Sequence, residues 1–555
     1  MSAHKVIKGQ NKITMGTAFS LVWLILAPEK QYMVLAMVYG VAISLLTLAV
    51  PISVQMLIDT VANTAMIRPV IVLSVVLFIL LLISGVLTAA RIHVMEMFGR
   101  RIYARLTGDI ALQSVHAKAA FFDGTDRADL INRYFDIMTL QRRVPLVLSG
   151  AFAIFLQSII GFIVVSLYHP ALLAFNIALI VLLTLTALLW GPRAIRRVIE
   201  LSHAKYNTGA CLQGIVAAGD FFKSSRHVDY VYNRVEQQTS NYIDASIRFF
   251  GPSFGQSLAL LLLYALSSAT LLGLGGVLVI EGQLTLGQLV AAELIMSAIF
   301  VGIAQFTSYL EAIYDIFAAC EELSLVYGIP HQRARERTEL DVGGEELCFH
   351  DVTMPGTSKQ LSLRLPGGSI SSLVMEKSAD RRRIINYLKG YQQPEQGHIT
   401  LGGHDLREFD SHDLRDRIVV IDRQSLIQCR IIDLLKLAAP DADRADFWDM
   451  LQITGVDKVI RLLPDGLDTW LTSRGRPLSG FDTMRLKLTA AMLAGAKVIV
   501  LPELDDLLSD EDYENIVSYL RTRGDISLVC LTQRRRNIDF DEVMDVDAYK
   551  SEAAQ

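Results

Sequence analysis

Long runs without a charged residue dominate roughly the first 320 positions of the chain. Gln31 to Ile58 and Pro69 to Ala90 contain no Asp, Glu, Lys or Arg, and neither does the longer stretch from Val144 to Pro192. A helix needs about 20 apolar residues to cross a bilayer. The runs therefore predict membrane-spanning helices, and the longest run has room for two, with a turn at Tyr168-His169-Pro170.

Two further runs complete a predicted set of six spans. Phe249 to Ile280 carries no charge, and Leu286 to about Leu310 is interrupted only by Glu293. A charge inside a span is costly unless it faces water or a partner. Glu293 is therefore a candidate cavity residue that contacts substrate or takes up protons. The alternative is a carboxyl group that is paired with a polar residue between helices, or simply protonated.

A shorter apolar run, Phe19 to Ala27, follows three lysines near the start of the chain. Its order is that of a signal peptide, but bulky Ile25 stands where a cleavage site needs a small residue. We expect residues 1–30 to be a cytosolic segment with a helix at the membrane surface, and a signal peptide is the alternative.

Basic residues gather in two segments, which orient the spans. The first segment carries Arg100, Arg101, Arg105, Lys118, Arg127, Arg133, Arg142 and Arg143. The second carries Arg193, Arg196, Arg197, Lys205, Lys223, Arg226, Arg234 and Arg248. By the positive-inside rule both segments, and with them both termini, are cytosolic. Both are rich in helix formers and show no strand pattern, which favours two long helical hairpins over two small cytosolic domains.

The remaining composition narrows the function classes. The net charge of −5 gives no reason to expect a nucleic-acid partner. The five cysteines are odd in number and scattered, which suits a reducing cytosol and predicts no metal site.

From about Gly343 the chain has mixed polarity, and short apolar strands alternate with helical segments. Leu347 to Val352, Leu361 to Leu365 and Ile370 to Met375 read as strands, and a helix is expected from Ile384 onward. Gly397 to Gly403, Arg417 to Ile421 and Lys497 to Leu501 are further strand-bearing segments. This order predicts an α/β domain over residues 343–555, joined by a linker at 326–342 to a membrane domain at 31–325.

Several motifs in sequence order resemble those of ABC exporters. Six spans with two long cytosolic hairpins resemble the membrane domain of that family. Phe121-Phe122-Asp123-Gly124-Thr125, with Arg133 shortly after it, is similar to the first coupling-helix region. Gly282 to Gln288 resembles the start of the last span in type I secretion exporters. Leu463 to Thr469, followed by Leu478-Ser479-Gly480, resembles the approach to an ABC signature motif.

The resemblance implies a six-span α-helical domain followed by an α/β ATP-binding-cassette-like domain, with ATP and Mg²⁺ as cofactors. The segment equivalent to the P-loop runs from Met375 to Arg382. Met375 and Asp380 replace the two defining glycines, Arg381 replaces the lysine, and Arg382 replaces the hydroxyl residue that holds Mg²⁺. Without glycine the loop cannot make the phosphate cradle. Three consecutive arginines, from Arg381 on, could instead bind another anion or form a solvated basic turn.

The other catalytic positions of the family are altered as well. Pro502 replaces the Walker B aspartate and Gln533 replaces the switch histidine, while Glu503 keeps the general-base position. Arg423 stands in place of the Q-loop glutamine, and Met354-Pro355-Gly356 in place of an adenine-stacking tyrosine. After Leu478-Ser479-Gly480, Phe481 and Asp482 replace the usual Gly and Gln and would crowd and repel a phosphate. We therefore expect no active catalytic residue, no bound cofactor and no metal.

Three hypotheses remain open at this stage. The chain is a degenerate half-transporter in a heterodimer with an ATP-competent half, or a homodimeric scaffold that docks partners such as a periplasmic adaptor, or an ATPase with an unusual site. The lipid bilayer is a partner in each case, and the plan suits a bacterial inner membrane.

The orientation of the spans can be tested by labelling. A cysteine placed within Tyr168 to Pro170 should react with an impermeant reagent from outside the cell. A cysteine placed near Phe122 should react only from inside, since the basic segments are expected in the cytosol. The reverse labelling pattern would overturn this topology.

Overall fold

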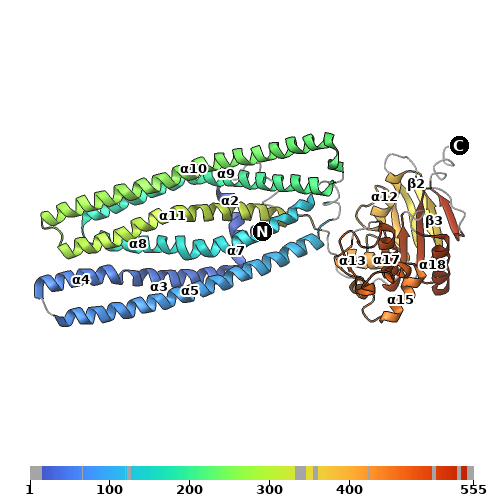
Figure 1. The fold of residues 1–555 in the computed structure, drawn as a ribbon, viewed down its shortest axis with the longest axis horizontal. Coiled ribbons are helices and arrows are strands. Elements are labelled where there is room, and N and C mark those ends of the chain that lie inside the picture. The colour runs from blue at the N-terminus through green and yellow to red at the C-terminus, as the bar shows by residue number, and fades with distance from the viewer. Residues whose placement is uncertain are drawn as a thin grey trace. The chain divides into compact units, whose positions relative to one another are not determined.

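The computed structural model describes residues 15–64, 67–118, 121, 127–219, 221–331, 346–353, 360–422, 426–502, 508–533 and 539–546. The chain divides into two compact units, Met1–His331 and Gln332–Gln555 (Figure 1).

Six helical segments of the first unit are long and apolar enough to cross a membrane, as predicted. The first segment is Phe19–Ile58, which takes in most of α2 (Met15–Leu26) with α3 (Lys30–Thr47) and much of α4 (Ala49–Thr64). The others are α5 (Ile67–Val115), α7 (Tyr134–Leu146) with a π-turn and α8 (Phe152–Ser166), α9 (Pro170–Ala217), α10 (Ser225–Ile280) and α11 (Leu286–Tyr327). At 1.5 Å per residue, the 49 residues of α5 extend about 74 Å. That is more than twice the roughly 30 Å of the hydrocarbon core, so the long helices continue well beyond a bilayer.

Polar caps fix where two of the helices begin. The His169 side chain accepts a hydrogen bond from the Ala171 N–H at 3.1 Å, and Pro170 occupies the first helical position of α9. Thr285 and Gln288 form a reciprocal capping box at the start of α11. These caps satisfy N–H groups that have no partner within the helix. The predicted turn and the predicted start of the last span are therefore both in place.

The run Phe19 to Ala27 is helical as far as Leu26, within α2 (Met15–Leu26), and it falls inside the first apolar segment, so its place at the membrane surface stays a prediction. Buried Glu29 follows it and pairs with Arg101 at 2.8 Å and Arg105 at 3.2 Å, both on α5. Arg105 also donates to the Ile25 carbonyl at 2.6 Å. The turn between α2 and α3 is thus held to α5 by charge-assisted hydrogen bonds.

The far ends of α5 and α11 are tied together through the backbone. The Lys118 N–H donates to the Pro330 carbonyl at 2.9 Å, and Ala117 and His331 form an antiparallel bridge. Helix α11 runs to Tyr327, so the first residues that we assigned to a linker at 326–342 are helical. α9 and α10 lie side by side along most of their length (Figure 1).

The second unit contains an α/β fold, as predicted, with two larger sheets and a two-stranded antiparallel sheet of β7 (Cys429–Arg430) and β8 (Trp470–Leu471) in its described residues. The largest sheet is parallel in the order β11 (Glu542–Asp545), β3 (Ile370–Val374), β10 (Ser527–Thr532), β9 (Val498–Leu501) and β6 (Ile418–Val420). The second sheet is antiparallel in the order β2 (Gln360–Leu365), β1 (Leu347–Thr353), β4 (His398–Leu401) and β5 (His404–Asp405). The longer helices are α12 (Ser378–Leu388), α14 (Ile431–Ala438), α15 (Arg444–Ile453), α17 (Gly480–Leu493) and α18 (Asp510–Arg523).

One expected boundary in this unit is wrong. Helix α12 begins at Ser378 and not at Ile384, because the first turn of the helix replaces most of the expected loop. The parallel strands β3, β9 and β10 end at a common edge, since Val374 pairs with Thr532 and Leu501 pairs with Cys530. Ligands of open α/β sheets bind at the carboxyl edge of the strands. A ligand-binding site in this unit is therefore expected among the residues that follow these three strands.

Candidate functional site

The segment after β3 is the equivalent of a phosphate-binding loop, and only three residues separate strand from helix. Met375 is buried and its N–H donates to the Thr532 carbonyl at 2.9 Å. Glu376 and Lys377 follow, and α12 begins at Ser378. Arg381 and Arg382, which replace the lysine and the Mg²⁺-binding residue of the family, are consequently in the first turns of a regular helix.

Asp380 occupies the position of the second glycine, and its side chain points into the protein. Only 4% of Asp380 is exposed, and its carboxylate pairs with Arg383 at 3.1 Å. The backbone N–H groups of Asp380 and Arg381 donate to the Lys377 carbonyl at 3.1 and 3.3 Å. A P-loop aims successive N–H groups at a phosphate, whereas these two are used within the helix.

The residues after β9 and β10 lie at the same edge. Pro502 is buried at the end of β9 and offers neither a carboxylate nor an N–H group for a metal-bound water. Gln533 follows β10 and is exposed. Glu503, Arg423 and the segment 354–356 lie outside the described residues, so their predicted roles stay predictions.

The signature-like segment Leu478-Ser479-Gly480 leads into α17. Leu478 is buried, Ser479 is the N-cap and Gly480 is the first helical residue. The Ser479 hydroxyl donates to the Asp482 carboxylate at 2.5 Å and accepts from the Asp482 N–H at 3.1 Å. Asp482, which replaces the usual glutamine, therefore binds the Ser479 hydroxyl through both its carboxylate and its backbone N–H.

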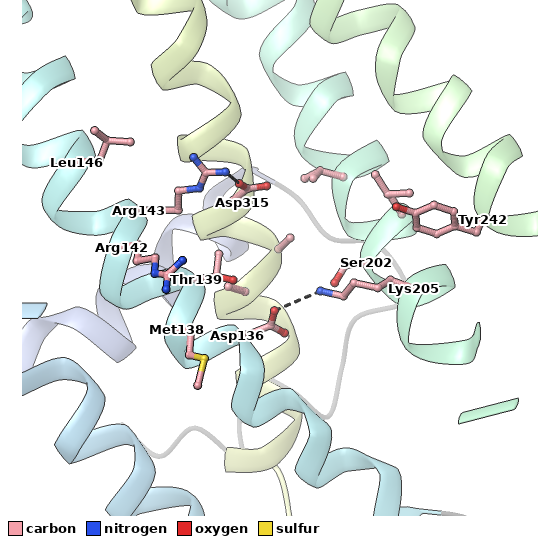
Figure 2. A pocket seen from close by; sticks show the side chains of 14 residues that line it. Asp136, Met138, Thr139, Arg142, Arg143, Leu146, Ser202, Lys205, Tyr242 and Asp315 are labelled. Atoms are coloured by element: carbon pink, nitrogen blue, oxygen red, sulfur yellow. Dashed lines mark hydrogen bonds and ion pairs between the residues drawn. The ribbon is translucent and has the colours of Figure 1, made fainter. Parts of the chain in front are cut away.

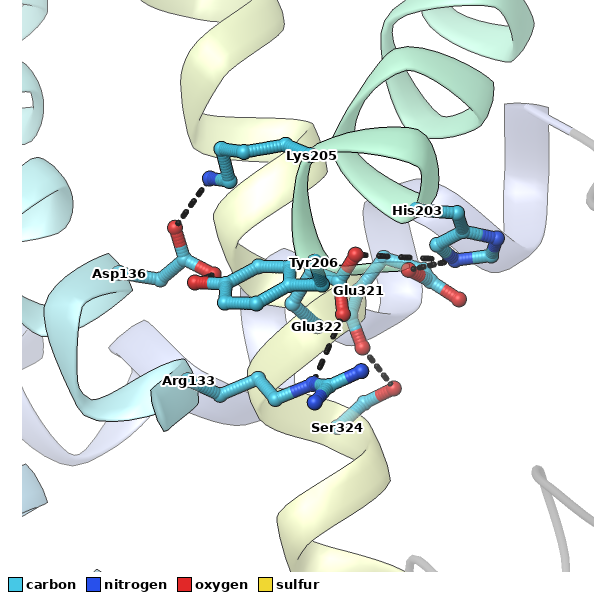
Figure 3. A network of polar contacts seen from close by, with 8 residues as sticks. All are labelled: Arg133, Asp136, His203, Lys205, Tyr206, Glu321, Glu322 and Ser324. Carbon is cyan, nitrogen blue, oxygen red and sulfur yellow. Dashed lines mark hydrogen bonds and ion pairs between the residues drawn. The ribbon is translucent and has the colours of Figure 1, made fainter. Parts of the chain in front are cut away.

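A second concentration of polar groups lies inside the membrane unit, where α7, α9 and α11 meet (Figure 3). Buried Arg133 donates to the Glu322 carboxylate at 3.2 Å and lies over the Tyr206 ring. The Tyr206 hydroxyl donates to Asp136 at 2.6 Å, and Lys205 pairs with the same carboxylate at 3.3 Å. Buried charges are tolerated when they are paired and hydrogen-bonded, so this network joins the three helices.

A cavity of about 600 Å³ opens beside this network (Figure 2). Its polar lining includes Arg142, Arg143, Lys205, Asp136 and Asp315. Arg143 pairs with Asp315 at 3.0 Å, and Lys205 pairs with Asp136. The sequence identified these arginines and this lysine only as orienting charges, because no local pattern shows that α7, α9 and α11 bring them together.

The coupling-region residues are described only in part. Arg133 is placed by the network above, and Phe121 is half-buried near the end of α5. Phe122 and Asp123 lie outside the described residues. Glu293 is half-buried on α11, and its Oε2 atom is buried without a hydrogen-bond partner in the described part of the chain. It does not line the cavity of Figure 2.

Comparison with known proteins agrees with this architecture. Residues 33–303 match the ABC transporter transmembrane region. A solved bacterial Atm1-family ABC exporter with ATP bound superposes with a TM-score of 0.78 at 17% identity, over 93% of both chains. The chain has the fold of an ABC exporter.

Curated proteins with sequence similarity include proteins named for transport and translocation. The lactococcin-A transport/processing ATP-binding protein of Lactococcus lactis is 21% identical over 86% of this chain and 68% of its own length. The alpha-hemolysin translocation ATP-binding protein of Escherichia coli O157:H7 is 22% identical over 90% and 72%. The mitochondrial ATP-binding cassette sub-family B member 10 of Mus musculus is 24% identical over 90% and 73%. The similarity therefore extends across both units of this ABC exporter fold.

The buried Arg133–Glu322 pair should contribute strongly to the stability of the membrane unit. Replacing Arg133 by Met leaves a fully buried carboxylate without its partner, which typically costs about 3–5 kcal/mol. We expect a clearly lower thermal midpoint of the purified full chain. The matched control is Arg100→Met, whose ion pair with Glu96 is exposed and should change stability by less than about 1 kcal/mol. Equal midpoints for the two variants would show that the buried pair contributes no more than the exposed one.

Glu293→Gln tests the role of the half-buried carboxyl group within the last span. Gln keeps the shape but removes the charge, whose burial is costly, so assembly and thermal midpoint should hold or rise. We expect the transport activity of the assembled complex to fall, measured in vesicles. If assembly and activity are both unchanged, the carboxyl group has no cavity role.

Proposed function

We propose that this chain is a degenerate ABC-exporter half-transporter, which neither binds nor hydrolyses ATP, and that it works with a partner in a membrane export complex. The support is the ABC exporter fold together with the segment that replaces the P-loop. Each proposed loss concerns a different part of nucleotide binding, so no single substitution carries the conclusion alone.

The main observation is that the polar groups between β3 and the first turn of α12 already have partners within the protein. The N–H groups of Asp380 and Arg381 donate to Lys377, and the Asp380 carboxylate is buried against Arg383. A phosphate would have to displace these contacts and would meet a buried negative charge. The two arginines that follow keep positive charge at the helix start, but the glycine positions that would let the backbone wrap an anion are filled.

The partner that fits best is an ATP-competent half-transporter, with which the chain forms a heterodimer. Retention of Leu478-Ser479-Gly480 favours this assignment, because a signature motif acts on the nucleotide of the opposite subunit in the family. The most apolar window of α5 has no residue buried within this chain. That helix is free to contact lipid or a second subunit, as a dimer in the bilayer requires.

The names of the curated relatives suggest the kind of export. Two of them are named for lactococcin-A transport/processing and alpha-hemolysin translocation. Type I secretion-like export is therefore the proposed process, in a bacterial inner membrane with both termini in the cytosol. A periplasmic adaptor protein is a further proposed partner.

A second candidate function is a homodimeric scaffold that docks partner proteins without transport. Phe481 at the start of α17 is 51% exposed, and Asp482 already occupies the Ser479 hydroxyl. An exposed aromatic side chain and an occupied serine favour protein contact over phosphate contact. Purification without any partner separates the two, because a stable homodimer supports the scaffold and a monomer supports the heterodimer.

The purified chain is expected to bind no ATP. This chain has substitutions at four sets of positions that bind nucleotide in the family: the phosphate cradle, the metal ligands, the adenine-stacking residue and the switch histidine. If each of these four losses costs about 1–3 kcal/mol, their sum of about 4–12 kcal/mol equals or exceeds the roughly 4 kcal/mol behind a millimolar dissociation constant. Titration with a fluorescent ATP analogue and Mg²⁺, with a phosphate-release assay in parallel, measures this. Saturable binding at micromolar nucleotide would contradict the proposal.

Two variants serve as controls in the same binding and phosphate-release assays. Glu503→Gln stalls an active ABC ATPase and should here leave both readouts unchanged. A multiple variant with Met375→Gly, Asp380→Gly, Arg381→Lys, Arg382→Thr and Pro502→Asp restores the phosphate and metal ligands. Binding in this variant alone shows that the site was lost through these residues.

A further inference from the structure

Three side chains that the proposed function does not use meet where α9 packs against the end of α11. His203 lies on α9, and Glu321 and Glu322 are neighbours on α11 (Figure 3). Each offers one ligand atom, and the three atoms lie within 4.8 Å of one another. The His203 Nε2 atom is 2.9 Å from Glu321 Oε2 and 3.8 Å from Glu322 Oε1.

Glu322 shows that the cluster is more than a set of surface charges. Its side chain is 0% exposed, and Arg133 donates to its Oε2 atom at 3.2 Å. Its Oε1 atom is buried, has no hydrogen-bond partner in the described residues, and faces His203. A buried acceptor without a close donor is costly, and the nearest groups, the Ser202 hydroxyl and the His203 ring, leave this oxygen able to take a ligand.

The balance of charges around the cluster also favours a bound positive charge. Asp136 is compensated by Lys205 and by the Tyr206 hydroxyl, and Glu322 is compensated by Arg133. In the described part of the chain, the Glu321 carboxylate pairs with His203, whose side chain is 46% exposed. With a neutral imidazole the network thus has one carboxylate more than it has permanent cations. A proton on His203 or on a buried carboxyl group, or a bound cation, balances this charge.

We propose that His203, Glu321 and Glu322 form a binding site for a divalent transition-metal ion such as Zn²⁺. One imidazole nitrogen and two carboxylate oxygens suit Zn²⁺ or a similar ion better than Mg²⁺ or Ca²⁺, which prefer oxygen ligands alone. Three protein ligands leave one tetrahedral position for water, and the half-exposed imidazole gives the ion access from solvent.

Arg133 has a defined role in such a site. It holds one oxygen of Glu322 by a hydrogen bond and so directs the other oxygen toward His203. Ligating carboxylates are commonly oriented in this way by partners outside the coordination sphere. A bound ion would join α9 to the last two turns of α11, and this inference does not depend on whether the second unit binds ATP.

The test uses the full-length chain in detergent, freed of metal with a chelator, and Zn²⁺ in competition with a chromogenic chelator. We expect one equivalent per chain with a dissociation constant of roughly micromolar or tighter. His203→Gln, which can still donate to Glu321, and Glu321→Gln should each weaken binding beyond the ~10–100-fold typical of outer-shell changes. Glu322→Gln is avoided because it disturbs the Arg133 pair.

The matched control is His404→Gln in the second unit. His404 and Glu408 form an exposed histidine–carboxylate pair at 3.3 Å, with two ligands and not three. This variant should bind Zn²⁺ as the unchanged chain does. Unchanged thermal midpoints of the metal-free variants show that folding is intact. If a variant does not fold, a midpoint rise on adding Zn²⁺ to the unchanged chain, reversed by chelator, supports the site.

Cobalt(II) identifies the ligand types. Cys320 is buried next to Glu321, and a thiolate ligand would produce an intense near-ultraviolet charge-transfer band. We expect visible d–d absorption without that band, and its loss in His203→Gln. The proposal is overturned if no ion binds below millimolar concentration, if the thiolate band appears, or if His203→Gln and Glu321→Gln both bind Zn²⁺ as tightly as the unchanged chain. In those cases the cluster is an ion-pair network with a protonated His203.

Discussion

Within the hydrocarbon of a bilayer every backbone N–H and C=O must find its hydrogen-bond partner inside the protein. That requirement forces the first unit into long helices, and most of the structure follows from it. Helices of 42 to 56 residues carry the chain through the membrane and well beyond it. Several charges that the unit buries are paired, as buried Arg133 is with Glu322 and buried Glu29 is with the partly buried Arg105.

The helices and the general fold were readable from the sequence because their signals are local. A charge-free run, a proline after a histidine and a Thr-x-x-Gln cap each act over a short stretch of chain. In the structure helices cover the runs, and α9 and α11 begin at the proline and after the capping threonine. The polar network of Figure 3 was not readable, since Arg133 and Glu322 are 189 positions apart. The adjacent acids Glu321 and Glu322, in an otherwise apolar stretch, were the one local sign of it.

The second unit shows a different limit of sequence reasoning. The missing glycines at Met375 and Asp380 were apparent, and they led us to expect a loop that cannot fold as a cradle. The structure has a helix there from Ser378 on, because the residues after Lys377 have no need for left-handed backbone angles and can make helical hydrogen bonds. Likewise, the substitution of Asp482 was visible, but its hydrogen bond to Ser479 depends on the cap geometry of α17.

The backbone bridge between α5 and the segment after α11 has a mechanical consequence. Pro330 and His331 are bonded to Lys118 and Ala117, just before the chain continues into the second unit. A pull on the chain at His331 is therefore shared between α11 and α5, which both run through the membrane unit. A rotation of the end of α11 relative to α5 would strain this bridge, so the two helix ends are expected to move together.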